Sequence, residues 1–404
     1  MVVALLMLVY TCGYIDRYAL TIVLDQVKLS FQASDTYMGF LAGPAFALFF
    51  TLASLPVARL ADRHSRVNIL ALGCATWSAF TLACAFAQTK LGFTIARLGV
   101  GLGEAACLAP AYSLLSDYFP PRRRALPVGF FNVSVYLGQI TGLWLGGGLA
   151  AQMGWRRMYW YIGAPGLLIA LLFRILVREP RRGALDGAGS LPAATTFLAT
   201  ARALFARPAF PRLVAGAALT TFAGMGFAYW APVFFMRVHH MTRAQVGWQY
   251  GLVFGLSSMA GALLAGRLGN HLGQVRAGGA LRIAAIAGPV TLAFMAAVCF
   301  APGVAAALAL LVPAGLANGA WLVPVQATLQ DLIDAGSRAT AAAVFACSSL
   351  LIGFLGPWAV GALSDVWSPR FGDDTLRYAI AAVLLVGVAG GHAFAQAGRH
   401  AART

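Results

Sequence analysis

Residues 101–125, GLGEAACLAPAYSLLSDYFPPRRRA, contain landmarks that return in the second part of the chain. Asp117 returns as Asp331, 214 positions later. The same offset joins further identical pairs: Gly101 and Gly315, Pro110 and Pro324, Arg124 and Arg338, Gly142 and Gly356, Trp144 and Trp358, Gly147 and Gly361, and Leu149 and Leu363. The sequence therefore predicts two related halves, because a fixed offset shared by many landmarks indicates an internal repeat.

The composition places both halves in a membrane. Of the 404 residues, 60% are hydrophobic and only 10% are charged, whereas about 25% of the residues in a soluble domain are charged. Apolar runs of roughly 20 residues, enough to cross a bilayer, follow one another: 1–24, 36–59, 67–87, 90–119, 124–151, 157–178, 208–236, 244–268, 280–300, 303–333, 339–364 and 375–396. We expect an all-α membrane protein with twelve transmembrane helices in two pseudo-symmetric six-helix bundles, residues 1–180 and 207–404.

Arginine is concentrated in the even-numbered loops between these runs, including 122–124 and 174–182. Cytoplasmic loops of membrane proteins carry such an excess of basic residues. Both termini and the linker, residues 181–206, are therefore expected on the cytoplasmic side of the plasma (inner) membrane. Within the linker, apolar residues at helical spacing predict a short helix on the membrane surface, with a plain tether as the alternative: Phe197, Leu198, Ala201, Leu204 and Phe205.

Several classes of protein are excluded by what the sequence lacks. The net charge of +16 comes from arginines in short loops, and no basic patch with interleaved aromatic residues indicates a nucleic-acid partner. The 6 cysteines all lie in apolar runs without a CxxC pair, so neither a metal site nor a cofactor is expected. Enzyme motifs such as HExxH and GxSxG are absent, so the chain is not predicted to be an enzyme.

Four ionisable residues interrupt the apolar runs of the first half. Asp16 and Arg17 lie in the first run, and Arg97 and Glu104 lie seven residues apart in the fourth. An ionised side chain at mid-bilayer costs roughly 2.5–3.5 kcal/mol even on the lenient insertion scale. Seven residues are two helical turns, so Arg97 and Glu104 share one face about 10 Å apart. We expect all four charges to meet at one level of the membrane.

Two interpretations of these charges remain open. In the structural one, two buried salt bridges lock the first helix to the fourth, although such bridges stabilise weakly. In the functional one, Asp16 and Glu104 exchange protons in a water-accessible cavity while Arg17 and Arg97 bind an anionic headgroup. The repeat places Leu311 and Asn318 at the positions of Arg97 and Glu104, so the fold does not require the charges.

The second half offers apolar and aromatic residues instead. The stretch FAGMGFAYWAPVFF, residues 222–235, is rich in aromatic side chains. We expect an uncharged wall that holds the tail of an amphipathic molecule, formed by Tyr229, Trp230, Trp321 and Phe345. Glycines spaced four apart in 138–148, mirrored in 353–361, are expected to let helices of opposite halves approach and slide.

The stretch ARLADRHSRVNIL, residues 58–70, resembles the loop 2–3 signature of the major facilitator superfamily. Within that superfamily, GYIDRYAL (13–20), residues 101–125 and GWRRMYWYIGAPG (154–166) resemble the Spinster group of lipid transporters. The resemblance implies a cytoplasmic gate network between the halves, to which we assign Asp62, Arg63, Arg66, Asp117 and Arg124. It also implies proton-coupled, alternating-access transport of a lysophospholipid or a sphingosine-1-phosphate-like molecule.

Alternatives to lipid–proton coupling stay open at this stage. A carrier for drugs, sugars or organic anions uses the same architecture of two parallel halves around a central site. An uncoupled lipid scramblase or facilitator could use the same cavity. The expected partners are an amphipathic substrate, protons and membrane lipids, and a monomer is expected.

Overall fold

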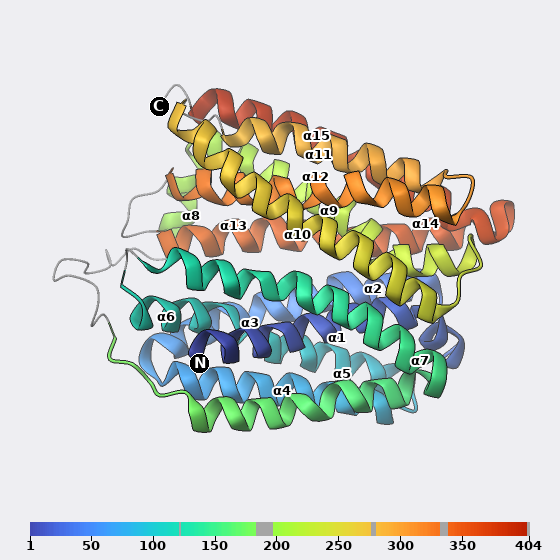
Figure 1. The fold of residues 1–404 in the computed structure, drawn as a ribbon, viewed down its shortest axis with the longest axis horizontal. Helices are drawn as coiled ribbons and strands as arrows, with labels where there is room; N and C mark the ends of the chain where they lie inside the picture. The colour runs from blue at the N-terminus through green and yellow to red at the C-terminus, as the bar shows by residue number, and fades with distance from the viewer. Residues whose placement is uncertain (121–122, 183–196, 276–279, 332–337, 402–404) are drawn as a thin grey trace. The chain divides into compact units, whose positions relative to one another are not determined.

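The computed structural model describes residues 1–120, 123–182, 197–275, 280–331 and 338–401 (Figure 1). The first helices are α1 Val2–Ser30, α2 Asp35–Phe40, α3 Phe46–Arg63, α4 Arg66–Phe86, α5 Lys90–Glu104, α6 Leu108–Tyr118 and α7 Ala125–Leu176. After the linker come α8 Phe197–Phe205, α9 Ala209–Arg237, α10 Arg243–Val275, α11 Ala280–Cys299, α12 Val304–Asp331, α13 Arg338–Gly353, α14 Leu355–Phe371 and α15 Thr375–Ala401. A π-helical turn, Leu41–Ala45, joins α2 to α3, and a 3-10 turn, Gly372–Asp374, joins α14 to α15.

In the described ranges, 10 helical stretches are long and apolar enough to cross a membrane. Two of them, Leu126–Leu176 with 51 residues and Ala341–His400 with 60, are each too long for one crossing, which takes roughly 20 residues. The first is broken at Gly154, whose φ of 81° favours glycine. The second is broken at Phe354 and again at Gly372, where φ is 54°. Each stretch therefore has room for two of the twelve predicted crossings.

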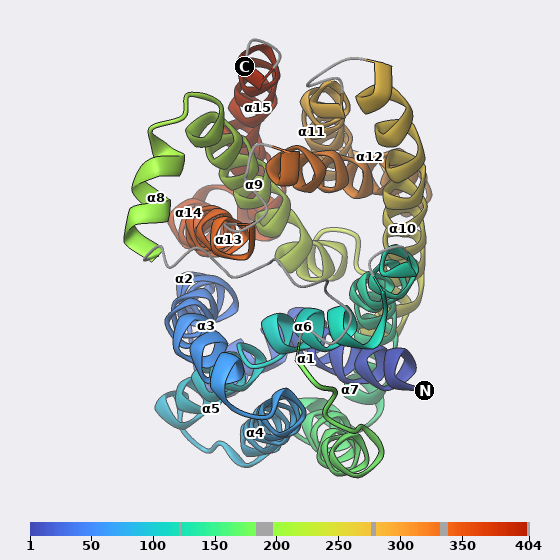
Figure 2. The same cartoon turned by 90° about the vertical axis from the view of Figure 1, so that its left-hand side faces the viewer.

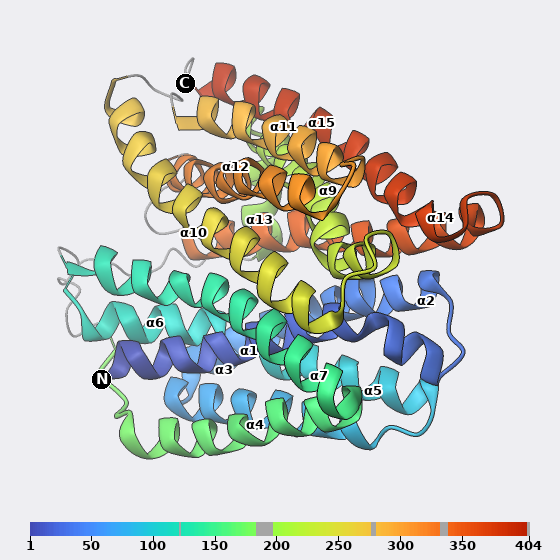
Figure 3. The same ribbon diagram turned by 45° about the vertical axis from the view of Figure 1, so that its right-hand side comes forward.

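The chain divides into two compact units, Met1–Ser190 with Met241–Gly251, and Leu191–His240 with Leu252–Thr404. In the first unit α1 runs along α7, and α4 packs against α5 and α7 (Figure 3). In the second unit α9 packs against α13 and α15 (Figure 2). The start of α10 belongs to the first unit because the Arg243 Nε donates a hydrogen bond to the Ile22 carbonyl at 3.0 Å.

The internal repeat is visible in the packing of each unit. A Cβ on Gly101 would lie 3.2 Å from the carbonyl oxygen of Phe46. The repeat partner Gly315 contacts its own unit in the same way, since a Cβ there would lie 3.1 Å from the carbonyl oxygen of Phe254. Phe46 and Phe254 stand in helices that follow the first helix of each half, so both halves use the same glycine contact to bring these helices together.

Most of the mirrored glycines pack within their own half of the sequence, so the expectation that they bring opposite halves together is confirmed only at Gly147. A Cβ on Gly142 of α7 would lie 2.8 Å from the Ile15 carbonyl oxygen of α1. Its counterpart Gly356 of α14 presses on the backbone of Phe222 in α9. The physical reason is close packing of long helices inside each bundle, which only a residue without a Cβ permits here. Gly147 differs, because it contacts the start of α10.

The predicted span 90–119 is interrupted just after Glu104, where α5 ends and residues 105–107 turn before α6. Pro110 explains the break, because it has no N–H to bond the carbonyl four residues earlier, that of Ala106. The repeat-related helix α12 runs unbroken through Asn318. In the first half, the buried carboxylate of Glu104 therefore lies at the end of a helix, whereas the corresponding residue of the second half, Asn318, lies inside a continuous helix.

Residues 197–205 form a helix, α8, as the spacing of the linker's apolar residues predicts. Leu204 is 5% exposed and belongs to the hydrophobic core of the second unit. The ring of Phe205 lies 5.2 Å from that of Phe210 at the start of α9. The side chains of Phe197 and Leu198 lie outside the described residues.

Candidate functional site

The four predicted charged residues lie together in the first unit, where each residue of α1 forms an ion pair with a residue of α5. Arg97 of α5 donates from Nη1 to Asp16 Oδ2 of α1 at 2.7 Å. Arg17, the next residue of α1, donates from Nε to Glu104 Oε2 at 2.6 Å, and its Nη2 contacts the same oxygen. Each α1 residue therefore has a partner of opposite charge on α5, and the site carries no net charge.

The Asp16–Arg97 pair is sealed inside the helix bundle. Asp16 is 1% exposed and Arg97 3% exposed. The second carboxylate oxygen of Asp16 accepts a hydrogen bond of 2.8 Å from the Thr81 hydroxyl of α4. Both oxygens of Asp16 are thus satisfied, which is what a buried charge requires. Sequence analysis missed Thr81, because a threonine in an apolar run gives no signal of a polar contact across helices.

The hydrogen bonding of the Arg17–Glu104 pair is less complete than that of the Asp16–Arg97 pair. Glu104 is 4% exposed, and its Oε1 is buried without a hydrogen-bond partner among the described residues. The Arg17 side chain is 15% exposed. A carboxylate with one unmatched oxygen costs more to keep ionised in low dielectric than one with both oxygens bonded.

Three aromatic rings surround the Arg17 guanidinium. Its central carbon lies 4.9 Å from the ring centroid of Tyr14, 4.5 Å from that of Phe46 and 5.4 Å from that of Phe50. Such cation–π contacts stabilise a cation that has left bulk water. The charged residues of the first half are therefore accompanied by aromatic rings, which the sequence analysis expected only in the second half. The contact of Tyr14 could have been predicted from the sequence, because Tyr14 lies one helical turn before Arg17. The contacts of Phe46 and Phe50 could not, because they depend on how α3 packs against α1.

The aromatic residues predicted to line a tail cavity lie in the packed interior of the second unit. Trp230 is 0% exposed and donates its indole N–H to the Pro357 carbonyl at 2.8 Å. Trp321 and Phe345 belong to the hydrophobic core. Tyr229 is 5% exposed, and its ring lies against that of another core aromatic at 6.2 Å. Their packing in this structure is with protein, so it gives the predicted tail wall no support.

Arg66, predicted as a gate residue, is buried in a network at the start of α4. Its Nε donates to Glu179 Oε1 at 2.7 Å, and its Nη1 pairs with Asp117. The same Nη1 donates to the Ser113 hydroxyl at 2.9 Å, and Nη2 donates to the Pro180 carbonyl at 3.1 Å. The partners of Arg66 all belong to the first unit, so in this structure its hydrogen bonds hold the ends of α4, α6 and α7 together.

The other gate candidates lie near this network or outside the described residues. Arg63 is exposed at the end of α3. Arg124 donates from Nε to the Phe119 carbonyl at 2.8 Å, across the turn before α7. Asp62 lies in α3, and its side chain lies outside the described residues.

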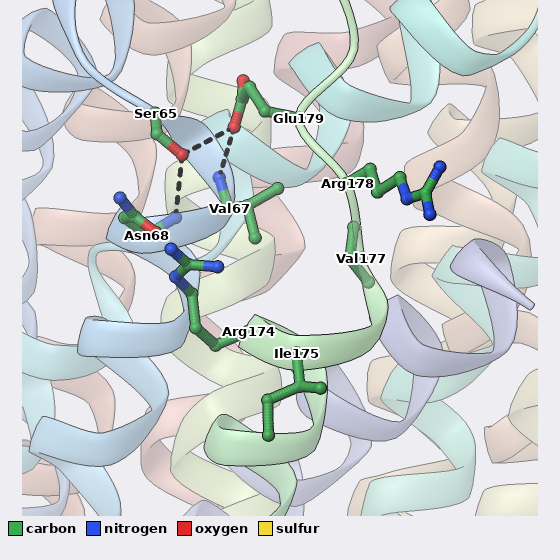
Figure 4. Close-up of a pocket in the computed structure, with 8 residues that line it drawn as sticks. All are labelled: Ser65, Val67, Asn68, Arg174, Ile175, Val177, Arg178 and Glu179. Carbon is green, nitrogen blue, oxygen red and sulfur yellow. Dashed lines mark hydrogen bonds between the residues drawn. The ribbon is translucent and has the colours of Figure 1, made fainter.

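Glu179 completes the hydrogen-bond network of Arg66, and sequence analysis missed it. Its Oε2 accepts from the backbone N–H of Val67 at 2.9 Å and from the Ser65 hydroxyl at 2.8 Å (Figure 4). Burial alone would raise the pKa of this carboxyl, but the bonds from Val67, Arg66 and Ser65 outweigh it and lower the pKa. The sequence did offer a sign of this role, because Glu179 is the one acidic residue among the arginines of REPRR, residues 178–182.

Known proteins resemble this chain over most of its length. The family model for the Major Facilitator Superfamily matches residues 6–357. An MFS-type efflux pump of Mycolicibacterium smegmatis is 31% identical over 398 residues, 95% of this chain and 90% of the pump. Human protein spinster homolog 1 is 26% identical over 421 residues, 98% of this chain and 79% of the human protein. A solved bacterial homolog of the human lysosomal transporter Spinster is 27% identical with a TM-score of 0.87, covering 99% of this chain and 96% of that one.

Proposed function

Because the chain belongs to the Major Facilitator Superfamily, we propose that it carries an amphipathic, phosphate-bearing lipid across the membrane by alternating access, driven by protons. The family match and the Spinster structure confirm the all-helical transporter fold expected from the sequence. They also confirm the resemblance to the Spinster group. The chain is a multi-pass secondary transporter of a family that does not comprise enzymes.

One observation carries the proposal: Arg17 is held by a carboxylate, Glu104, that has a free oxygen. A proton on Glu104 would remove its negative charge and weaken its hold on Arg17. The released guanidinium could then bind a phosphate through two parallel hydrogen bonds, which a planar fork favours. Proton and headgroup are thereby linked through the same ion pair.

The Asp16–Arg97 pair is the second candidate for the same exchange. The sequence predicts that Asp16 accepts a proton and that Arg97 completes the headgroup site. The Thr81 hydrogen bond and the near-complete burial of both residues make this pair harder to open than the first. We therefore assign it mainly to holding α1 against α5 while the Arg17–Glu104 pair exchanges partners.

The helix break beside Glu104 favours such an exchange. Interrupted helices commonly line the substrate and ion sites of secondary transporters, because their free backbone groups and loose ends tolerate rearrangement. Here α5 ends at Glu104 itself, and α6 begins only at Leu108. A small rotation about residues 105–107 would move the carboxylate without displacing the rest of the helix.

The substrate class rests on similarity and on the surroundings of Arg17. The sequence motifs that resemble the Spinster group imply a lipid, and the similarity to human protein spinster homolog 1 and to the solved Spinster homolog supports that resemblance. Rings around a cationic side chain suit a molecule with an anionic head and an apolar body. A second candidate is a carrier for drugs, sugars or organic anions, and similarity to the mycobacterial efflux pump favours export within this class. In either case we propose a monomer in the plasma (inner) membrane with both termini in the cytoplasm.

Uptake into liposomes tests the substrate class. The reconstituted protein, with an imposed pH gradient, would be offered lysophospholipids and sphingosine 1-phosphate alongside sugars and amphipathic drugs. We expect gradient-dependent movement of the phosphate-bearing lipids, and a far larger loss for them than for neutral amphipaths in Arg17→Ala. Movement of drugs but not lipids would instead favour the second candidate, and lipid movement indifferent to the gradient would indicate a scramblase.

A further inference from the structure

A pocket of about 250 Å³ lies where the ends of α4 and α7 meet. Its lining includes Ser65, Asn68, Arg174, Ile175 and Glu179 (Figure 4). The volume exceeds several-fold the ~30 Å³ that one water occupies in the liquid, so a phosphate headgroup fits. This pocket is separate from the charges of α1 and α5 that the proposed transport mechanism uses.

The pocket offers cationic and polar side chains that have no protein partner. The side chains of Arg174 and Asn68 are exposed and make no hydrogen bond or ion pair with another described residue. Figure 4 shows the Arg174 guanidinium directed toward Asn68. Arg178, four residues further on, is also exposed and unpaired within the described residues. A guanidinium beside an amide matches the oxygens of a phosphate.

The acid in the pocket does not cancel this charge. Glu179 already accepts bonds from Arg66, Ser65 and the Val67 amide, so both of its oxygens are occupied. The next amide of α4, that of Asn68, donates to the Ser65 hydroxyl at 3.2 Å. An incoming anion would therefore bind the free side chains rather than the helix N-terminus.

The same helices present an apolar surface directly beside the pocket. On α7, Leu168, Leu171 and Ile175 are 57%, 56% and 65% exposed, and their spacing puts them on one face. On α4, Leu72 is 68% exposed one turn beyond Asn68. In a chain that spans a membrane, such a face contacts acyl chains. Ile175 belongs both to this face and to the pocket lining, so the two surfaces are continuous.

We propose that this pocket binds an anionic phospholipid of the surrounding bilayer, apart from the transported substrate. The phosphate lies between Arg174 and Asn68, Arg178 contributes charge at the rim, and the acyl chains run along the face of Leu168, Leu171 and Ile175. The continuity of polar pocket and apolar face selects a membrane lipid over a free phosphate ion, which has no use for the apolar surface.

Native mass spectrometry of the full-length protein in detergent, titrated with phosphatidylglycerol or phosphatidylcholine, tests this site. Removing both arginines in Arg174→Gln/Arg178→Gln should weaken phosphatidylglycerol binding about 30-fold, given the usual contribution of a basic residue at an anionic surface. Phosphatidylcholine binding should not change. The charge-conserving Arg174→Lys/Arg178→Lys should retain most of the affinity, which also guards against loss through misfolding.

A matched control removes two exposed arginines elsewhere, Arg123→Gln/Arg399→Gln, and should leave phosphatidylglycerol affinity within about twofold. Equal weakening in both double variants would overturn the site in favour of general charge attraction. Displacement of phosphatidylglycerol by millimolar inorganic phosphate would also overturn it, because the pocket would then hold a free anion. Since none of these readouts involves transport, the site can fail while the transport proposal stands, and the reverse.

Discussion

Asp16 and Arg17 are neighbours in the sequence but face different surroundings. Successive side chains on an α-helix point about 100° apart. Asp16 therefore meets Thr81 of α4 and Arg97, whereas Arg17 meets the rings of α3 and Glu104. Two pairs of the same chemistry acquire different properties, one saturated with hydrogen bonds and one with an unmatched oxygen. In the proposed mechanism, this difference assigns the proton exchange to Glu104 before Asp16.

At the residue scale, Glu179 gives a prediction about pH. Its carboxyl has a lowered pKa in the fold, so its contribution to stability is complete above the unfolded value, about 4.3. That contribution disappears as the pH falls through the folded pKa. Glu179→Gln should lower the free energy of unfolding at pH 7 by about 1–2 kcal/mol, a modest value because the side chain is 30% exposed.

Thermal unfolding in detergent at pH 7 and at pH 3.5 measures this effect. The difference in stability between wild type and Glu179→Gln should narrow at the lower pH, because the unfolded wild-type chain then binds a proton at this position and the fold, with its lowered pKa, resists doing so. The exposed Asp373, in the turn between α14 and α15, supplies the control Asp373→Asn, which should behave as wild type at both pH values. An unchanged gap at pH 3.5 would show that the carboxylate charge plays no part.

The sequence could predict that the four charges meet but not how they pair. The spacing of Arg97 and Glu104 fixes a shared face of α5, and their cost in a bilayer demands partners. Which acid bonds which arginine depends on the rotation of α1, and that rotation is set by packing against α4 and α7. The same limit applies to Thr81 and Phe46, whose roles come entirely from contacts between helices.

At the scale of helices, the contact between α1 and α7 gives the clearest prediction. A Cβ on Gly142 would lie 2.8 Å from the carbonyl oxygen of Ile15, one residue before Asp16. Gly142→Ala should force the helices apart and cost about 1–3 kcal/mol, as overpacking does. Gly148→Ala on the same helix meets nothing within 4 Å in the described structure, so it should be tolerated.

Thermal stability of the two glycine variants in detergent, together with their lipid uptake, checks this prediction. Because α1 carries Asp16 and Arg17, Gly142→Ala should also reduce transport, whereas Gly148→Ala should leave it near the wild-type level. Equal stability of the two variants would mean that α1 and α7 do not approach as closely as described.

The length of the apolar runs predicted which segments form transmembrane helices, but it did not predict where a helix is interrupted. The runs predicted the crossings because the bilayer sets a minimum length. The break at residues 105–107 was missed although Pro110 signals it, since prolines are also tolerated inside transmembrane helices. The chain shows both outcomes, because α12 passes through Pro313 and Pro324 without a break.

At the scale of the whole chain, the fold is duplicated, but the buried charged side chains of the described residues all lie in the first half. Leu311 and Asn318 occupy the positions of Arg97 and Glu104, and the Asn318 amide donates to the Ser258 hydroxyl at 3.4 Å. The repeat was readable from the sequence because both copies keep the glycines that bring their helices together. The sequence could not predict that Met241–Gly251 belongs to the first unit, because this depends on contacts with α1 and α7.

The central claim is that the Glu104 carboxylate and the substrate phosphate compete for Arg17, and that a proton on Glu104 releases the arginine to the phosphate. The most direct test is lysophospholipid accumulation in proteoliposomes with an imposed pH gradient, comparing wild type, Glu104→Gln and the repeat-related control Asn318→Ala. Wild type and Asn318→Ala should accumulate lipid against its gradient, while Glu104→Gln, folded normally, should exchange lipid without accumulating it. Undiminished gradient-driven accumulation by Glu104→Gln would contradict the account.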